Sequence, residues 1–520
     1  MNQKIWILFK NDLWSSLHIN HLFRSGKQNN VAKLTAIVVL LMGILLLVYN
    51  AITAQSLANL GEAALIPTYM LSVSSIMMIF LSLLRANGTI FGNSDFEQLS
   101  TYPISEKEIF ISKLLHLYFF NLLISFLFTI PALLVWAPLA ALSPIWIILF
   151  CMVSLITPVI PICVGVIFGG FVYRLAAYFQ HMNLIAVLFS FILLGLFSYF
   201  VITHSNQSAQ MQDMHTMLYS QITTIYLPSV LLQFHNSQHI LPIFTFLFIS
   251  CFLLVALIHI GSKYYRNLHL LLIALTSKTN AKQQSIKQRN VRFAIWQKEF
   301  STLFSSYNYL LNSTLGIVVL IFFNTAILLF GMEKLTSALS LPFSIETIKN
   351  GYPMFIAAML LLSNPSTAAL SMEGNKIWIL KTLPMKQKHV IQAKLACTFS
   401  LHFIGFFISI LAFSIRLSPN VEQMIWAVII PLSYSAFIST FGLMLNFSYP
   451  YFSWKNDMYI VKQSPPVLIS AFTGMAMLLS PFVLILFDIL PISVIYLANS
   501  IILIVLSIGC YQRTCSIKLV

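Results

Sequence analysis

Very few side chains in this sequence have the type and spacing of a catalytic or metal-binding site. Two histidines, His235 and His239, are four residues apart, and imidazole nitrogen is a common zinc ligand. No carboxylate or cysteine lies near them in the sequence to complete a four-coordinate site. The sequence also lacks the G-x-S-x-G and H-E-x-x-H patterns of hydrolases and zinc proteases. We therefore predict no metal site and no catalytic residue, and we do not expect an enzyme.

The glycine pattern excludes a nucleotide-binding loop. Such a loop needs G-x-x-x-x-G-K-[ST], in which backbone amides surround the phosphates and the lysine reaches the β- and γ-oxygens. The only Gly-Lys pair is Gly26-Lys27, which Gln28 follows, and the only Gly-Gly pair, Gly169-Gly170, lies in an apolar run. ATP and its magnesium must therefore be bound by another polypeptide, and no cofactor is expected in this chain.

The composition explains why groups that could do chemistry are scarce. Of the 520 residues, 58% are apolar and 8% are charged, and the mean hydropathy is +0.86. An average soluble domain is roughly 25% charged, and a disordered chain combines high charge with few apolar residues. We therefore predict an all-α, polytopic membrane protein. The net charge of +15 is spread between apolar runs and forms no dense patch, so no nucleic-acid partner is expected.

Twelve apolar runs are long enough to cross a bilayer as helices, which takes about 20 residues each. They are 34–55, 64–85, 112–137, 145–172, 182–203 and 241–262 in the first half, and 311–331, 352–372, 392–415, 423–447, 467–488 and 491–512 in the second. A further run, 223–233, is too short to cross, and we interpret it as a re-entrant or interfacial piece. The basic segment before the first run is too long for a signal peptide, so no cleavage is expected.

The lysines and arginines predict the orientation of these spans. With twelve spans, 26 of the 29 basic residues fall on one side of the membrane, and only Lys334, Lys349 and Arg416 fall on the other. Cytoplasmic loops carry such an excess, so both termini are predicted to be cytoplasmic. The only carboxylate inside a predicted span is Asp488, at the outer end of its span. The chain therefore lacks the buried acids expected of a proton-driven pump.

The two halves of the chain share a repeated segment. LSTYPISEKEIFISK (99–113) and LKTLPMKQKHVIQAK (380–394) both connect the second and third spans of their half. At a constant offset of 281 residues, five positions are identical: Leu99/Leu380, Thr101/Thr382, Pro103/Pro384, Lys107/Lys388 and Lys113/Lys394. FKNDL (9–13) and WQKEF (296–300) likewise precede the two first spans. We predict two parallel six-span modules, 1–262 and 299–520, joined by a polar cytoplasmic linker at 263–298.

Each repeated segment is predicted to be a short helix at the cytoplasmic surface, because proline suits a turn or a first helical position. Ser105 and Glu108 have the spacing of a capping box, which the second copy lacks. The predicted exposed charges are Asp95, Glu97, Glu106, Lys107 and Glu108 in the first copy and Glu373, Lys376, Lys381, Lys386 and Lys388 in the second. Residues 1–24 and 291–306 have the apolar spacing of amphipathic helices that lie in the membrane interface.

A leading amphipathic helix, six spans and these cytoplasmic segments resemble the permease subunits of ABC type-2 exporters, in particular the Gram-positive bacterial permeases in which two modules are fused. The segment SYPYFSWKNDMYIVKQS (448–464) shares in this resemblance. It implies a bacterial cell-membrane protein that exports its substrate with two copies of a separate ABC ATPase. It assigns the ATPase-coupling role to two segments, at about 93–110 and 373–391. The residues of the first segment are Asp95, Glu97, Leu99, Thr101, Pro103, Glu106 and Lys107, with Lys113 just beyond it. Those of the second are Glu373, Leu380, Thr382, Pro384 and Lys388, with Lys394 just beyond it. One departure is that the outer segment between the last two spans is long in the first half (204–240) and almost absent in the second (489–491).

Two other classes stay open at this point. A secondary transporter of the major-facilitator type also has twelve spans in two parallel halves, but this sequence has little intramembrane charge. A membrane-embedded scaffold or enzyme without a transport role is the third class. The spans are rich in phenylalanine, with 43 in the chain, and poor in polar groups. An amphipathic peptide or a lipid-like molecule is the cargo that fits them best.

Overall fold

The computed structural model describes residues 3–17, 27–91, 96, 99–139, 144–179, 182–205, 214–232, 234, 240–280, 290–338, 344–452, 454, 457–486 and 491–517. These residues form helices and turns, with no β-strand among them. The chain divides into two compact units, residues 1–20 with 36–283 and residues 21–35 with 284–520. We describe each unit by itself.

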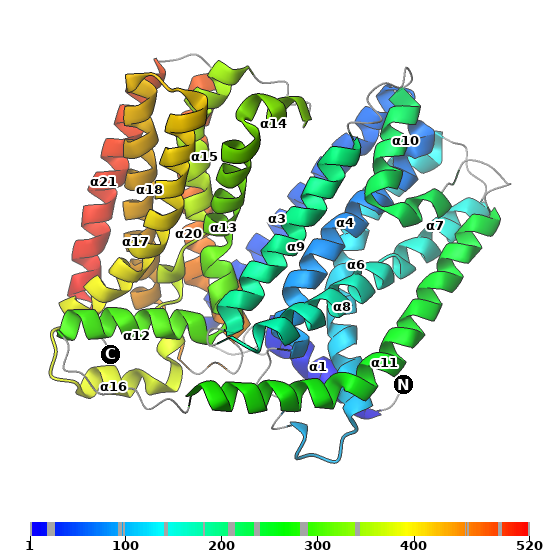
Figure 1. The fold of residues 1–520 in the computed structure, drawn as a ribbon, viewed down its shortest axis with the longest axis horizontal. Coiled ribbons are helices and arrows are strands. Elements are labelled where there is room, and N and C mark those ends of the chain that lie inside the picture. The colour runs from blue at the N-terminus through cyan, green and yellow to red at the C-terminus, as the bar shows by residue number, and fades with distance from the viewer. Residues whose placement is uncertain are drawn as a thin grey trace. The chain divides into compact units, whose positions relative to one another are not determined.

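The first unit consists of helices, labelled in Figure 1, with a π-helical turn, η2 (Asn87–Phe91), directly after the helix α4. They are α1 (Gln3–Leu17), α3 (Lys27–Asn59, from residue 36 on), α4 (Ile66–Ala86), α6 (Glu106–Leu139), α7 (Pro144–Ile156), α8 (Val159–Ala176), α9 (Met182–Ser205), α10 (Met214–Ile225) and α11 (Ile240–Asn280), with 3-10 turns η1 (Ala63–Leu65) and η4 (Leu227–Leu231).

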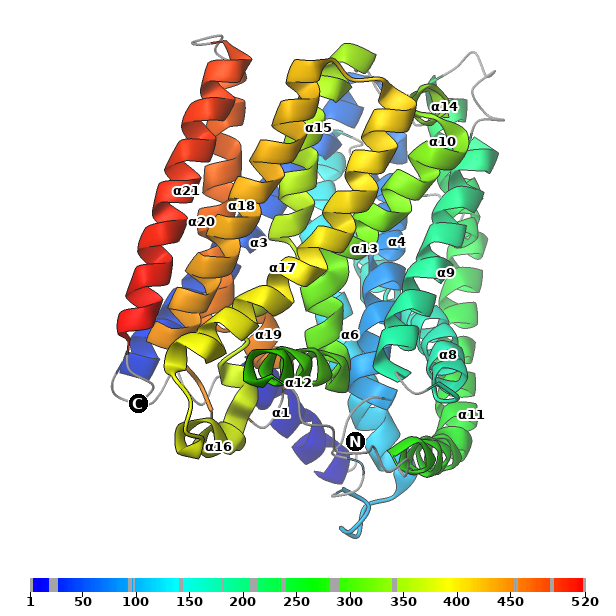
Figure 2. The ribbon, with the colours of Figure 1, turned by 60° about the vertical axis from the view of Figure 1, so that its left-hand side comes forward.

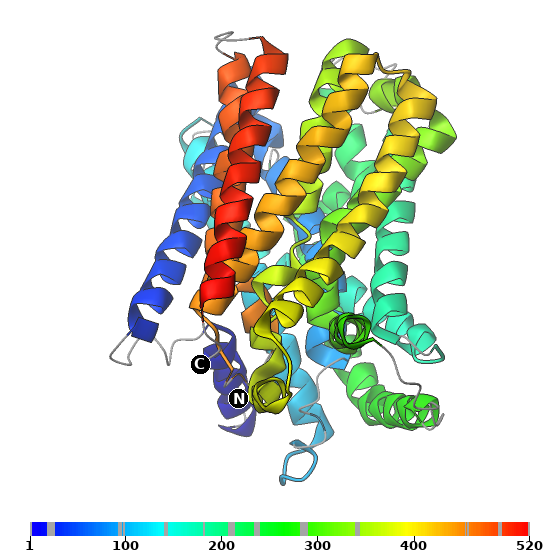
Figure 3. The same cartoon turned by 90° about the vertical axis from the view of Figure 1, so that its left-hand side faces the viewer.

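The second unit has a similar inventory of long helices and several short turns (Figure 2). They are α12 (Val291–Ser305), α13 (Tyr307–Phe330), α14 (Met332–Ala338), α15 (Ile345–Leu361), η6 (Pro365–Thr367), η7 (Ser371–Lys376), α16 (Ile377–Thr382), α17 (Gln387–Ala412), η8 (Phe413–Leu417), α18 (Val421–Ser448), α19 (Asp457–Lys462), α20 (Pro465–Leu486) and α21 (Ile492–Ser516). In Figure 3, α21 runs alongside α18, and the two helices are in extensive contact.

Eleven helical segments in the described part of the chain are long and apolar enough to cross a membrane. They overlap eleven of the twelve predicted spans. The twelfth, 182–203, coincides with α9, whose described apolar part is the shorter segment Met182–Leu196. The predicted all-helical, multi-pass membrane class is therefore confirmed.

The packing of these helices suits a lipid environment. Large apolar side chains such as Leu45 and Phe248 point outward and are more than 70% exposed. Small polar side chains lie inside and bond across helices, as Asn121 on α6 does when its Nδ2 donates to Ser82 Oγ on α4 at 3.1 Å. In the second unit, Asn324 Nδ2 on α13 donates to Ser409 Oγ on α17 at 2.9 Å. Lipid offers no partner for such groups, so they gather between helices.

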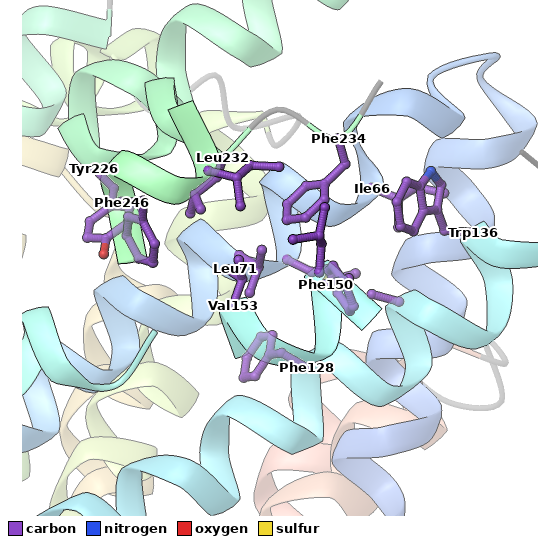
Figure 4. Packing of buried hydrophobic residues seen from close by; sticks show 14 of the residues in the cluster. Ile66, Leu71, Phe128, Trp136, Phe150, Val153, Tyr226, Leu232, Phe234 and Phe246 are labelled. Atoms are coloured by element: carbon purple, nitrogen blue, oxygen red, sulfur yellow. The ribbon is translucent and has the colours of Figure 1, made fainter. Parts of the chain in front are cut away.

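An apolar cluster of the first unit contains aromatic residues from several helices (Figure 4). Phe234 stands edge to face against both Trp136 and Phe150, which are tilted to each other, and the three ring centroids are 5.5–5.8 Å apart. The run 223–233 forms the end of α10 and the turn η4, and its Tyr226 and Leu232 are buried in this cluster. Thr68 on α4 donates from Oγ1 to the Leu232 carbonyl at 2.6 Å, which fixes the turn against the start of α4.

Two segments differ from the sequence-based expectation. The span predicted at 352–372 is not one helix: α15 ends at Leu361, and two 3-10 turns follow within a buried stretch before α16. The linker predicted at 263–298 begins with helix, because α11 continues to Asn280. Tyr265 and His269 on this extension both contact the Ile90 carbonyl, at 3.4 and 3.1 Å, so packing against η2 stabilises it.

Candidate functional site

In the first unit, an ion pair ties the leading helix to the third predicted span. Lys113 Nζ lies 3.0 Å from Asp12 Oδ2, and the two side chains are 6% and 22% exposed. Asp12 is on α1, and Lys113 is two turns into α6. Exposed ion pairs contribute about 0–1 kcal/mol, and the attraction is stronger where water is largely excluded. The ion pair therefore helps the apolar contacts to hold α1 against α6.

The loop before α6 is held from two sides. Lys4 on α1 donates from Nζ to the Pro103 carbonyl at 2.6 Å, and Arg266 on α11 pairs with Glu106 at 3.3 Å. The Ser105 backbone N–H donates to Glu108 Oε2 at 2.8 Å, and Ser105 Oγ accepts from the Glu108 N–H at 3.3 Å. This reciprocal pair confirms the predicted capping box at the start of α6.

In the second unit, the equivalent lysine lies in a larger ionic cluster. Lys394 on α17 is fully buried, and its Nζ lies 2.9 Å from both carboxylate oxygens of Glu299 on α12. The same ammonium donates to Glu373 Oε1 at 2.9 Å and to the Ala369 carbonyl at 2.8 Å. Lys298, which is 40% exposed, adds a second cation on Glu373. Two carboxylates and two ammonium groups therefore neutralise one another, as buried charges must.

The ionic cluster stands beside the irregular stretch 362–376. Asn446 Oδ1 on α18 accepts from the backbone N–H groups of Leu370 and Ser371, at 2.7 and 3.1 Å, and the Trp454 indole donates to the Ser371 carbonyl at 2.8 Å. Gly374 has φ +53°, and a Cβ there would lie 3.2 Å from the Trp454 ring. Non-helical backbone is tolerated at membrane depth where protein groups satisfy it, and these side chains do so.

The predicted site residues divide by exposure. Exposed ones are Thr101, Pro103, Lys107, Thr382, Pro384 and Lys388; half-buried ones are Leu99 and Glu106; buried ones are Lys113, Glu373, Leu380 and Lys394. Asp95 and Glu97 lie outside the described residues. The exposure expected for Glu108 and Glu373 is wrong, because one carboxylate caps α6 and the other neutralises Lys394.

The second predicted surface helix, 373–391, is also not continuous. It comprises the end of η7, the six-residue helix α16, a turn at 383–386 and the first residues of α17. In the described chain no side chain caps α17 at Lys386, in line with the missing capping box. Gln387 Nε2 instead donates to the Ile517 carbonyl at 2.5 Å, which ties the start of α17 to the end of α21.

Each unit thus presents a protruding surface around the proline that the internal repeat shares. We call Thr101, Tyr102, Pro103 and Lys107 the first loop surface, and Trp378, Lys381, Thr382, Pro384 and Lys388 the second loop surface. Tyr102 and Trp378 are 60% and 61% exposed. Figure 2 shows α16, which carries most of the second surface, at the end of its unit beside α12. Exposed aromatic and basic groups of this kind suit contacts with another protein.

Sequence reasoning missed the acids that hold these surfaces. Asp12 and Glu299 occupy the same place in FKNDL and WQKEF, and Lys113 and Lys394 match in the longer repeat. An acid and a base that recur together in both copies are a signal that the two side chains touch. Asn446 and Trp454 carried no comparable signal, because they bond to the backbone around Ser371 and, from Asn446, to the Ser371 hydroxyl, and none of these groups has a matching charge.

The contacts described above join the leading helix of each unit to the helix that follows its repeated loop. Nowhere in the described part of the chain do three His, Cys, Asp or Glu side chains group as a metal site would require. Comparison of the sequence with protein-family models and with curated proteins finds no match, and comparison with solved structures finds none either.

Proposed function

We propose that this chain is the membrane-spanning subunit of an ATP-driven exporter whose ATP is hydrolysed by a separate subunit. The carrying observation is the acid–lysine pair between the leading helix and the third span, which occurs in both units at residues that the sequence repeat aligns. In this proposal the chain is two parallel six-span modules, each with an interfacial leading helix and one docking surface for an ATPase subunit.

The contacts suggest how a push on the docking surface reaches the spans. In the first unit, the Pro103 carbonyl accepts a hydrogen bond from Lys4 on α1. The same helix is held to α6 by the ion pair between Asp12 and Lys113. Movement of the first loop surface therefore moves α1 and α6 together. In the second unit, Lys394 on α17 binds Glu299 on α12 and Glu373 in the stretch before α16, so these three segments are joined. A buried ion pair resists separation because each charge left alone in a low dielectric costs several kcal/mol.

The proposed cargo is an amphipathic peptide or a lipid-like molecule that moves outward across the cell membrane. The spans carry many exposed apolar side chains, and the polar side chains that they bury are mainly small hydroxyl and amide groups. Such walls suit an apolar or amphipathic molecule better than a hydrated ion, for which rings of carbonyl or charged groups are needed. Both termini and both loop surfaces are proposed to lie in the cytoplasm, since the basic residues collect there.

The test is to purify the chain from its native membrane, to identify any ABC ATPase that copurifies, and to measure the mass of the complex. We expect one copy of this chain and two ATPase subunits, one per loop surface. The matched variants are Tyr102→Ala and Trp378→Ala, which each remove one exposed aromatic side chain. Each single variant should bind one ATPase subunit, and the double variant should bind none.

Two outcomes would refute the proposal. One is a complex that contains two copies of this chain per ATPase pair. The other is transport into vesicles that needs no ATPase but follows an ion gradient, which would favour a secondary carrier.

A further inference from the structure

A groove between α12 and the start of α17 has the chemistry of an anion-binding site. Its volume is about 340 Å³, and it is lined by Arg292, Phe293 and Trp296 on α12 and by His389, Ala393 and Ala396 on α17. Sites for small molecules typically begin at about this size. We propose that this groove binds the phosphate headgroup of an anionic phospholipid from the inner leaflet.

Two polar side chains of the groove are ready to hold a phosphate. Arg292 is exposed, and no described residue forms an ion pair or a hydrogen bond with its guanidinium group. His389 lines the groove, and its Nδ1 is covered and, within the described part of the chain, has no hydrogen-bond partner, so the imidazole has to turn to present this atom to a ligand. A buried polar atom without a partner costs about 1–3 kcal/mol, so a ligand that accepts from it binds favourably. A phosphate can accept two parallel hydrogen bonds from arginine and one more from an imidazole N–H.

The rest of the groove suits the glycerol and upper acyl chains of a lipid. Phe293 is 47% exposed, and its ring lies 5.4 Å from that of Trp296. The Trp296 indole donates to Ser400 Oγ at 3.3 Å, which keeps the ring against α17. Across the groove stand Ala393 and Ala396, whose small side chains leave room beside the aromatic rings. Tryptophan is enriched at the depth of lipid headgroups for the same combination of apolar and polar contact.

The groove is already formed in the chain without a ligand. Glu299, one turn beyond Trp296 on α12, is bound to Lys394 on α17, which follows the groove residue Ala393. α12 lies across the ends of the spanning helices of its unit (Figures 1 and 2), where a headgroup would stand. The basic residues predict that this end faces the cytoplasm, and the cytoplasmic leaflet carries the anionic lipids. The helices are therefore already in place, and binding needs only a turn of the His389 side chain.

The first unit has no such site at the aligned positions. Ile5 stands where α12 has Arg292, and Glu108 stands where α17 has His389. An apolar residue and a carboxylate cannot hold an anion, and the Glu108 carboxylate already caps α6. The inference is thus one anionic lipid per chain, and it stands whether or not the chain binds an ATPase.

The experiment measures lipid binding to the full chain purified in a nonionic detergent. Dioctanoyl phosphatidylglycerol and dioctanoyl phosphatidylcholine are titrated separately, and bound lipids are counted by native mass spectrometry. We expect one phosphatidylglycerol per chain and no matching occupancy by phosphatidylcholine. Arg292→Gln should weaken binding about tenfold, because a charge-assisted hydrogen bond is lost. His389→Phe should weaken it by roughly threefold to tenfold for the lost imidazole N–H.

The matched control is Arg513→Gln, which removes an exposed arginine near the end of α21 in the same unit. It should bind phosphatidylglycerol as the unmodified chain does. Equal occupancy by the two lipids, or unchanged binding by the Arg292→Gln protein, would overturn the proposal. Displacement of the lipid by millimolar inorganic phosphate would also overturn it, since the site would then select a free anion.

Discussion

The two acid–lysine pairs use the same residue types in different surroundings. Asp12 is partly exposed, so water shares in stabilising its charge. Glu299 and Glu373 are 5% and 6% exposed, and they rely on Lys394 for most of their compensation. Removal of one partner of a buried pair costs about 3–5 kcal/mol, whereas removal of the whole set is often nearly neutral. The two lysines should therefore differ sharply in their importance for stability.

Replacement of Lys394 by methionine tests this difference. Lys394→Met should lower the free energy of unfolding by about 3–5 kcal/mol, because two buried carboxylates lose their main cation. Lys113→Met should cost markedly less, since Asp12 can be hydrated. Thermal unfolding in detergent, followed by tryptophan fluorescence, compares them. Adding Glu299→Gln and Glu373→Gln to Lys394→Met should restore much of the loss. Equal melting temperatures for the two lysine variants would contradict this account.

Gly374 provides a second test at a single residue. Its φ of +53° and the nearby Trp454 ring both oppose a side chain, so Gly374→Ala should cost about 1–3 kcal/mol. The control is Gly351→Ala in α15, where the described structure has nothing within 4 Å of the added Cβ. Alanine favours helices over glycine by roughly 1 kcal/mol, so this variant should match or exceed the original melting temperature. Equal melting temperatures for the Gly374→Ala and Gly351→Ala variants would show that neither the backbone nor the Trp454 ring requires glycine at position 374.

At the level of helices, hydropathy predicts where chains cross but not where helices break. The eleven spans were predictable because each apolar run fills about 20 positions without interruption. The break after Leu361 was missed because no charged residue interrupts the run up to Met372, although the small polar residues there and the Asn364-Pro365 pair are typical of a turn. What permits the break is Asn446 and Trp454, more than 70 residues later in the chain. The extension of α11 and the burial of Glu373 escaped prediction for the same reason, because both depend on tertiary partners.

Replacement of Pro103 and Pro384 tests whether the two loop surfaces couple the ATPase to the spans. Proline presets the backbone dihedral φ, and glycine restores freedom to the chain. The double variant Pro103→Gly with Pro384→Gly should insert into the membrane at the normal level, because the spans are untouched. Transport-dependent stimulation of the ATPase should fall severalfold. Thr101→Ser with Thr382→Ser is the conservative control at neighbouring positions. Full stimulation in the double glycine variant would argue against transmission through these loops.

For the whole molecule, the distribution of basic residues along the two units predicts which loops face the cytoplasm and which face outward. Asn280 ends α11 next to the boundary between the units, on the side predicted to be cytoplasmic. The segment around Gln210 lies between the fifth and sixth predicted spans and is predicted to face outward. The sequence supported this topology through charge counts alone, because lysine and arginine bias acts during insertion and does not depend on tertiary contacts.

Cysteine labelling in intact cells checks the topology directly. In a variant without the six native cysteines, Asn280→Cys should react only with membrane-permeant maleimides. Gln210→Cys should react with impermeant ones added from outside. Disruption of the cells should expose both positions equally, which controls for intrinsic reactivity. The reverse pattern would rule out the twelve-span arrangement.

The break in the second unit has a consequence for biogenesis. During synthesis, residues 362–376 leave the ribosome long before Asn446 and Trp454, which bond to their backbone. Until α18 arrives, several peptide groups of this stretch have no native partner, and lipid cannot supply one. The second unit therefore cannot be released into the bilayer one helix at a time. The insertion machinery has to shelter the half-made unit until α18 is complete, and a chain truncated near residue 420 should be degraded faster than one truncated near residue 465.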